Sequence, residues 1–229
     1  MNRLRDLALN LATGVVALCV VVLNVVTIHQ RYLATPAGFQ ERLPPVMLED
    51  WRTLAAVGHR FGPRDADVTV VVFSDFECPM CRTFATETYP RFAAGFAGTT
   101  ALVYRHWPLS KHRLAYPAAK ASECAASQGR FREFHDLIYR EQNSLGLRTF
   151  RQFAMDAGVR ELDAFDECYA SVEEVAAIQR DIEAVRQIGG TGTPTVVVNG
   201  WLLRGGVGPE LLDSIARTSN ITGMEMPRK

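Results

Sequence analysis

The chain has 229 residues, of which 48% are hydrophobic and 22% charged, enough for one sizeable globular domain and an additional segment. The 25 basic residues are balanced by 25 acidic residues, so the charge gives no reason to expect nucleic-acid binding. Five cysteines are too few for a disulfide-framework protein, which indicates a domain that is held together by its own core.

The N-terminal segment contains no charged side chain from Leu7 to Ile28. At about 1.5 Å per residue, a helix of this length spans a bilayer core of roughly 30 Å. Arg3 and Arg5 precede the segment, so the positive-inside rule predicts a cytoplasmic N-terminus and an external remainder. A cleaved signal peptide is the alternative, since small residues occur at Ala34–Ala37, but signal peptides have a shorter apolar region. We therefore predict a cytoplasmic stub and a transmembrane anchor over residues 1–29.

The composition changes after the anchor. Residues 30–66 contain many prolines and glycines and little periodicity, which predicts a linker that holds the domain off the membrane. The domain is predicted over residues 67–218, followed by a polar tail over 219–229. Its first strand is the β-branched run Val68–Phe73, which is typical of a central strand covered on both faces.

The motif Cys78-Pro79-Met80-Cys81 follows this strand and begins a predicted helix that continues through Tyr89. Free N–H groups and the positive dipole end at the start of a helix stabilise an anion, so we expect the Cys78 thiol to ionise readily. Cys81 lies one turn further on, close enough to form a disulfide with Cys78 or to attack a mixed disulfide there. The pair can therefore carry two electrons.

Zinc binding, haem attachment and a purely structural disulfide fit the two cysteines less well than redox chemistry does. A structural zinc site needs a second close pair of ligands, and the three remaining cysteines stand alone and far apart. Haem attachment needs a histidine after the second cysteine, and this position is Arg82. A structural disulfide with so short a loop would stabilise the fold little. His106, His112 and His135 have no spacing typical of a metal site, so neither a metal nor a cofactor is expected.

Alternating strands and helices are predicted for the rest of the domain. Residues 101–107 form a strand that pairs in parallel with the first one, because a helix joins the two. The stretch from about 114 to 188 is predicted to be helical almost throughout. Asn199-Gly200 favours a tight turn between two apolar runs, which predicts a hairpin. A terminal helix begins at Pro209.

These motifs together resemble a known class. A strand is followed by Asp75-Phe76-Glu77-Cys78-Pro79-Met80-Cys81, a long helical stretch, and Gly192-Thr193-Pro194-Thr195 before a late strand. This order is similar to that of the DsbA-like disulfide oxidoreductases, which include DsbA and BdbD, and the similarity extends over roughly 67–216. The resemblance implies an α/β thioredoxin fold in which a helical domain, here about 114–188, is inserted and covers the catalytic face. It also implies a cis Thr193–Pro194 bond beside the active-site disulfide.

The resemblance implies roles for further residues. Glu77 is a candidate proton carrier for Cys81, as a carboxyl near this site is in the family, and a solvated acid in the first helical turn is the alternative. An apolar surface that accepts an extended polypeptide is expected beside the cysteines. Its candidates are Pro79, Met80, Trp107 and Thr193.

Cys124 and Cys168 are candidates for a second, structural disulfide. They fall on the first and fourth of the predicted inserted helices, and some relatives of the DsbA-like class carry a non-catalytic bond in this domain. Two buried free thiols that act as small hydrophobic residues are the alternative.

The predicted function is that of an extracytoplasmic thiol–disulfide oxidoreductase that forms disulfides in exported proteins. Its expected partners are reduced or unfolded exported proteins and, by resemblance, a quinone-linked DsbB-like or vitamin K epoxide reductase-like membrane protein. The Pro-Met dipeptide lacks the histidine of strongly oxidising DsbA proteins, so a membrane-tethered reductase or disulfide isomerase is one alternative. A non-catalytic polypeptide-binding (holdase) module is another, against which the intact cysteine pair argues.

Overall fold

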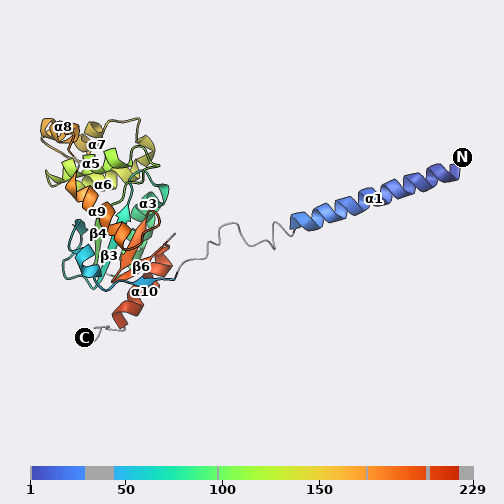
Figure 1. Cartoon of the computed structure of the whole chain (residues 1–229), viewed down its shortest axis with the longest axis horizontal. Helices are drawn as coiled ribbons and strands as arrows, with labels where there is room; N and C mark the ends of the chain where they lie inside the picture. Colours follow the sequence, from blue (N-terminus) through green and yellow to red (C-terminus); the bar gives the residue numbers. More distant parts are fainter. Residues whose placement is uncertain (1, 29–43, 97, 174, 205–206, 222–229) are drawn as a thin grey trace. The chain divides into compact units, whose positions relative to one another are not determined.

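The computed structural model describes residues 2–28, 44–96, 98–173, 175–204 and 207–221 (Figure 1). The chain divides into two units, residues 1–42 and 43–229. In the first unit, α1 (Asn2–Ile28) is a single helix. No helix within the described residues combines the length and the apolar character needed to cross a membrane. The predicted transmembrane anchor is therefore not confirmed, and residues 30–43 of the predicted linker lie outside the described residues.

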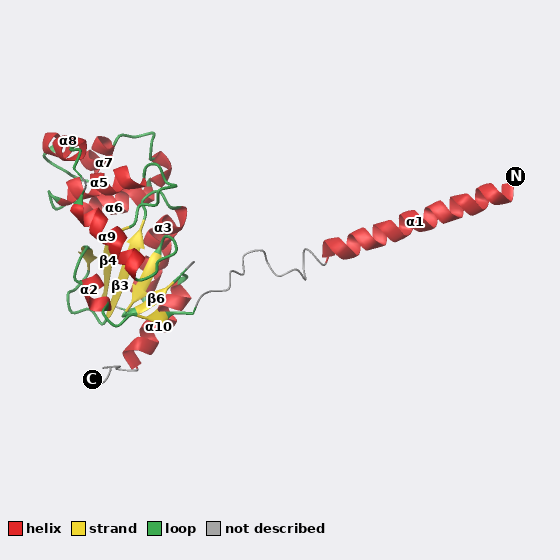
Figure 2. Ribbon diagram, in the orientation of Figure 1, coloured by secondary structure: helices red, strands yellow, loops and turns green. Residues whose placement is uncertain are grey.

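A six-stranded mixed sheet forms the centre of the second unit (Figure 2). The strand order is β1-β6-β5-β3-β4-β2. The β3–β4 pair is parallel, as predicted from the helical connection, and the other neighbours are antiparallel. The strands are β1 (Val46–Met47), β2 (His59–Phe61), β3 (Val68–Ser74), β4 (Thr100–His106), β5 (Thr195–Val198) and β6 (Trp201–Leu203).

The central strand β3 is buried along its whole length, as its β-branched sequence predicts. Side chains alternate across the sheet, so Val70 and Val72 enter one hydrophobic core while Val71 and Phe73 enter a second. The first core also contains residues of the inserted helices, and the second contains residues of the last inserted helix. Two apolar layers therefore hold the strand that leads into the cysteine motif.

The domain begins earlier than predicted. The edge strands β1 and β2 pair with β6 and β4, and both belong to the segment predicted as a linker. Between them, α2 (Trp51–Ala55) packs Trp51 and Leu54 against the second core. The predicted boundary at residue 67 is therefore wrong, because strands of two and three residues are too short to carry a periodic signal.

The helix after the cysteine motif is continuous but changes its hydrogen-bond pattern. It consists of α3 (Pro79–Thr83), the π-helical segment η2 (Phe84–Thr88) and α4 (Tyr89–Ala94). Within this segment, the Tyr89 N–H bonds to the Phe84 carbonyl. Pro90 follows directly, and a proline inside an α-helix has no N–H to donate and clashes with the preceding turn. A wider π turn relieves this conflict, which the sequence analysis did not foresee.

The predicted helical insertion is present. Its elements are α5 (Ala115–Ala126), α6 (Phe131–Arg140), η3 (Gln142–Ser144), α7 (Phe150–Asp156), α8 (Leu162–Ala170) and α9 (Ala176–Gln187). Helices α5 to α8 pack on one another at one end of the sheet (Figure 1), whereas α9 packs against β4. The buried Asp181 on α9 accepts hydrogen bonds from Arg105 Nε at 2.5 Å and from the His106 N–H at 2.7 Å. This carboxylate attaches α9 to the sheet.

The C-terminal elements follow the prediction closely. Asn199 and Gly200 join β5 to β6 with φ values of 44° and 95°, the positive values that a tight hairpin turn requires. Helix α10 (Pro209–Ile221) begins at the predicted proline. It extends beyond the predicted domain end at residue 218, and residues 222–229 of the predicted tail lie outside the described residues.

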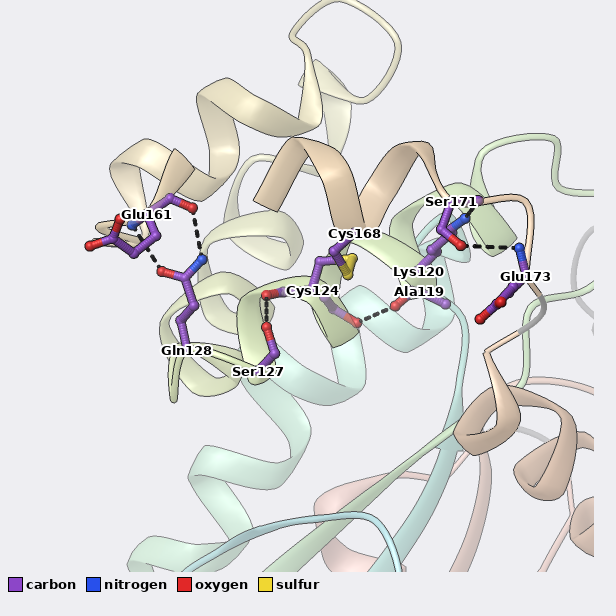
Figure 3. Close-up of a disulfide and its surroundings, with 10 residues drawn as sticks. Ala119, Lys120, Cys124, Ser127, Gln128, Glu161, Cys168, Ser171 and Glu173 are labelled. Carbon is purple, nitrogen blue, oxygen red and sulfur yellow. Dashed lines mark hydrogen bonds between the residues drawn. A yellow bond between two sulfur atoms is a disulfide. The ribbon is translucent and has the colours of Figure 1, made fainter. Parts of the chain in front are cut away.

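A disulfide between Cys124 and Cys168 joins α5 to α8 (Figure 3). Just after the end of α5, Gln128 exchanges two hydrogen bonds with the backbone of Glu161, the residue before α8, at 2.9 and 3.0 Å. The sequence analysis left open whether the two cysteines were bonded or free, and the structure contains the bond. The helices of the insertion are therefore linked covalently as well as by packing.

Replacement of Cys124 and Cys168 by alanine should lower the free energy of unfolding by about 4 kcal/mol, because the bond closes a long loop in the unfolded chain. Chemical denaturation of the oxidised wild type and of the double variant measures this difference. The single Cys124→Ala variant should lose the same amount, and an unchanged denaturation midpoint in both variants would contradict the stabilising role.

Candidate active site

The cysteine motif lies at the junction of a buried strand and a helix. Strand β3 ends at Ser74, and a short turn leads to Cys78, the residue that caps α3 with extended backbone angles of −77° and 122°. The Cys78 N–H bonds to the Asp75 carbonyl at 3.1 Å, and the Arg82 N–H bonds to the Cys78 carbonyl at 3.1 Å. The backbone therefore fixes the first cysteine at the start of the helix.

The two sulfur atoms have different environments. Both thiols are free, so the structure shows the dithiol form. Cys78 is 6% exposed, whereas Cys81 is completely buried. The Cys78 thiol donates to the Thr193 carbonyl at 3.4 Å, and Cys81 Sγ accepts from the Asp75 N–H at 3.4 Å. An external sulfur can therefore reach Cys78 but not Cys81.

The electrostatics of the site separate the two thiols further. A hydrogen bond from the Cys81 thiol lowers the pKa of Cys78 from 9.0 to about 5, despite partial burial, which acts in the opposite direction. Thr193 and the backbone N–H groups of Cys81 and Met80 lower this pKa as well. Burial raises the pKa of Cys81 well above 9.0, and the neighbouring Cys78 raises it further. Cys78 is thus the thiol that ionises readily, and Cys81 is the partner that keeps its proton.

The late loop before β5 completes the surroundings of Cys78. The Thr193–Pro194 peptide bond is cis, as the family resemblance implied. The Thr195 hydroxyl donates to the Gly192 carbonyl at 2.7 Å, which closes the turn. Because β5 pairs with β3, this loop lies beside the turn that follows β3, and the Thr193 carbonyl reaches the thiol.

Asp75 organises the turn, although the sequence analysis assigned it no role. It is 1% exposed and accepts three hydrogen bonds: from the Glu77 N–H at 2.7 Å, the Leu109 N–H at 2.8 Å and His112 Nδ1 at 2.8 Å. One carboxylate thus ties the cysteine turn to the loop after β4. The sequence position of Asp75, directly after a buried strand, could have indicated this role, because a buried carboxylate needs several hydrogen-bond donors.

Gln142 is a second residue that the sequence analysis missed. Its amide donates to the carbonyls of Phe76 at 2.8 Å and Cys78 at 3.0 Å. It belongs to η3 in the helical insertion, far from the motif along the chain. This contact connects the insertion to the active-site turn and satisfies two buried carbonyl groups, and no local sequence signal identifies it.

The predicted proton carrier Glu77 has a different environment from the one expected. Its carboxylate accepts a hydrogen bond from the Leu114 N–H at 2.5 Å, at the start of α5. Among the contacts of the described residues, none joins this carboxylate to Cys81. Glu77 therefore attaches the cysteine turn to the helical insertion.

A pocket of about 540 Å³ opens beside Cys78. Its lining consists of Cys78, Pro79, Met80, Leu109, Ser110, Lys111, His112, Thr191, Gly192 and Thr193. The pocket thus includes three of the four residues predicted for a polypeptide-accepting surface, and the Met80 side chain is 53% exposed there. The prediction for Trp107 is not supported, because its ring packs in the second core against the Gly190 backbone.

Comparison with known proteins places this geometry in a family. The family model described as thioredoxin matches residues 55–215, well over half of the chain. The chain belongs to the thioredoxin family. The match includes the cysteine motif, the helical insertion and the cis-proline loop, so the family assignment covers the whole candidate site.

Solved structures share the fold of this thioredoxin-family domain. A thioredoxin-like oxidoreductase from Silicibacter pomeroyi is 28% identical, with a TM-score of 0.58 over 70% of this chain and 91% of that chain. Oxidised BdbD from Bacillus subtilis is 19% identical, with a TM-score of 0.63 over 71% and 92% of the two chains. Wolbachia pipientis alpha-DsbA1 is 18% identical, with a TM-score of 0.60 over 72% and 94%.

Curated relatives are longer proteins. The Na⁺/H⁺ antiporter NhaA 3 of Salinispora tropica is 38% identical over 145 residues, which are 62% of this chain and 22% of the antiporter. NhaA 1 of Salinispora arenicola is 36% identical over 169 residues, which are 73% of this chain and 25% of the antiporter. The chain thus spans about a quarter of the length of these relatives.

Alkylation of Cys78 should follow a titration with a midpoint of about pH 5, because the thiolate is the reactive form. Replacement of Cys81 by alanine removes the largest of the interactions that lower the pKa of Cys78 and should therefore raise this midpoint. The rate of reaction with iodoacetamide measures both values in a Cys19→Ala background, which removes the exposed free thiol outside the motif. A wild-type midpoint of about 8.5, that of an ordinary cysteine, would contradict the described electrostatics.

Proposed function

We propose that this protein is an extracytoplasmic thiol–disulfide oxidoreductase that introduces disulfides into exported proteins. The observation that carries the proposal is the pairing of an acidic Cys78 that lines an open pocket with a completely buried Cys81 of raised pKa. Stabilisation of the Cys78 thiolate favours the reduced form of the pair, which makes the disulfide form an oxidant. The lowered pKa of Cys78 stabilises the reduced form fully above pH 9.0, and this stabilisation is lost as the pH falls through about 5. It is therefore present at neutral pH.

The oxidation of a substrate proceeds in two exchanges. A substrate thiolate attacks Cys78 Sγ in the oxidised enzyme, the Cys78–Cys81 bond breaks, and Cys81 leaves with the electron pair and takes up a proton. A second substrate thiolate then attacks the substrate sulfur of the mixed disulfide, and Cys78 leaves as a stable thiolate. The substrate loses two electrons, which the enzyme retains as its dithiol. The burial of Cys81 directs the first attack to Cys78.

The partners follow from this electron balance. The electron donors are reduced or unfolded exported polypeptides. The pocket beside Cys78 offers them Met80 and Pro79 as apolar contacts. Reoxidation requires an electron acceptor, for which we propose a quinone-linked membrane protein of the DsbB-like or vitamin K epoxide reductase-like class. Attachment to the same membrane would raise the effective concentration of the two proteins.

The compartment is part of the proposal. Disulfides persist in oxidising compartments, so the Cys124–Cys168 bond favours a location outside the cytoplasm. The uncharged segment Leu7–Ile28, preceded by Arg3 and Arg5, favours an N-terminal anchor with the domain on the outer side. Proteins named as Na⁺/H⁺ antiporters contain a segment similar to this chain, which also favours function at a membrane.

The direction of electron flow separates this proposal from its first alternative, a thiol reductase or disulfide isomerase. Equilibration of the Cys78–Cys81 couple with glutathione buffers measures its reduction potential. We expect a value near about −120 mV, as for an oxidase, because the Cys78 thiolate is stabilised. A value near about −270 mV would overturn the oxidase assignment and favour a reductase.

A trapping experiment separates both enzymes from a non-catalytic holdase. The Cys81→Ala variant cannot resolve a mixed disulfide, so it should accumulate covalent complexes with reduced polypeptides through Cys78. Non-reducing electrophoresis detects these complexes, and the matched variant with both Cys78→Ala and Cys81→Ala should form none. Equal binding of polypeptides by the two variants, without any covalent complex, would support the holdase instead.

A further inference from the structure

A second cluster of chemically active side chains lies outside the dithiol site. His59 on β2, His106 at the end of β4 and Glu123 on α5 come from three separate elements. The Nε2 atoms of His59 and His106 lie 2.5 and 2.8 Å from the same carboxylate oxygen, Glu123 Oε1. One potential ligand atom from each residue lies within 4.8 Å of the others. The fold thus brings two imidazoles and a carboxylate to one point.

This donor set suits a divalent transition-metal ion. Zinc binds imidazole nitrogen and carboxylate oxygen at about 2.0 to 2.2 Å, and sites with three protein ligands keep a position open for water. Both imidazole nitrogens contact the same carboxylate oxygen, Oε1. A cluster formed only for hydrogen bonding could use both oxygens of the carboxylate. A cation at the convergence point would take the place of the hydrogen bonds that now join the two imidazole nitrogens to Oε1.

Neighbouring aromatic residues fix the orientation of both rings. The His59 ring stacks on Phe131 with a centroid distance of 3.4 Å and an angle of 7°. The edge of the His106 ring meets Tyr104 at 5.2 Å, and His106 is 1% exposed. Rigid ligands lose little conformational freedom on binding, which favours affinity.

The cluster is also open to solvent on one side. The side chains of His59 and Glu123 are 24% and 17% exposed, so a hydrated ion can approach them from solution. The buried His106 then provides the inner ligand. The Phe76 ring, 6.2 Å from the His106 ring, belongs to the turn before Cys78, so the cluster is near the dithiol site, but none of its three residues lines the pocket beside Cys78.

We propose that His59, His106 and Glu123 form a binding site for one divalent transition-metal ion, for which Zn²⁺ is the matching probe. The ion would connect the edge strand β2, the strand β4 and the helix α5, and would therefore stabilise the folded domain against unfolding. The sequence analysis expected no metal site, since it compared His106 with His112 and His135 and did not consider His59.

Titration calorimetry with Zn²⁺ on the tag-free, full-length protein tests this site. The protein is used in its oxidised form, with Cys19→Ala, so that the Cys78–Cys81 bond and the substitution remove competing thiols. We expect one ion per chain and a melting temperature that rises with the Zn²⁺ concentration. Co²⁺ in place of Zn²⁺ should show the visible absorption of a site with nitrogen and oxygen ligands.

Matched variants identify the ligands. His59→Gln and Glu123→Gln keep polar side chains that can still form hydrogen bonds, and each should weaken Zn²⁺ binding at least about tenfold. His112→Gln, which removes a histidine at the dithiol site, should leave Zn²⁺ binding unchanged. For the two ligand variants, unchanged circular dichroism and, after reduction, unchanged Cys78 alkylation rates show that the domain is folded; for His112→Gln, which lies at the dithiol site, circular dichroism alone is the measure of folding. No binding by the wild type, or equal binding by the wild type and both ligand variants, would overturn the proposal.

Discussion

The effect of the Cys81 side chain on the pKa of Cys78 is the interaction on which the site depends. It requires one sulfur at the start of a helix and the other a turn later in a fully buried position. In that arrangement the surroundings lower the pKa of Cys78 and raise the pKa of Cys81, so the two thiols favour opposite charge states. The reactive thiolate and its leaving partner are thus consequences of a single geometric constraint, which the strand β3 and the helix α3 impose.

The rest of the domain keeps this constraint in place. Asp75 attaches the cysteine turn to the loop after β4, and Gln142 attaches it to the helical insertion. Both residues satisfy backbone groups that burial would otherwise leave without partners, and such groups are costly. The cis-proline loop adds the carbonyl of Thr193. Three segments that are distant along the chain therefore meet at one short turn.

The helical insertion consists of two parts that contact the sheet differently. Helices α5 to α8 form a group that the Cys124–Cys168 bond holds together, whereas α9 covers one face of the sheet through the buried carboxylate of Asp181. The group also supplies Glu123, which meets two histidines from the sheet. The junction between the sheet and the insertion thus contains polar and charged side chains both at the dithiol site and at the cluster of His59, His106 and Glu123.

The sequence by itself determined the features that depend on local patterns. The β-branched run predicted β3, Asn199-Gly200 predicted the hairpin, and the Cys-x-x-Cys spacing at a helix start predicted an acidic first cysteine. Only the tertiary structure decided which distant groups surround them. Edge strands of two and three residues, the contacts of Asp75 and Gln142, and the meeting of His59 with Glu123 arise from pairing and packing over long separations. Such contacts leave no periodic signal along the chain, because the folding of the whole domain creates them.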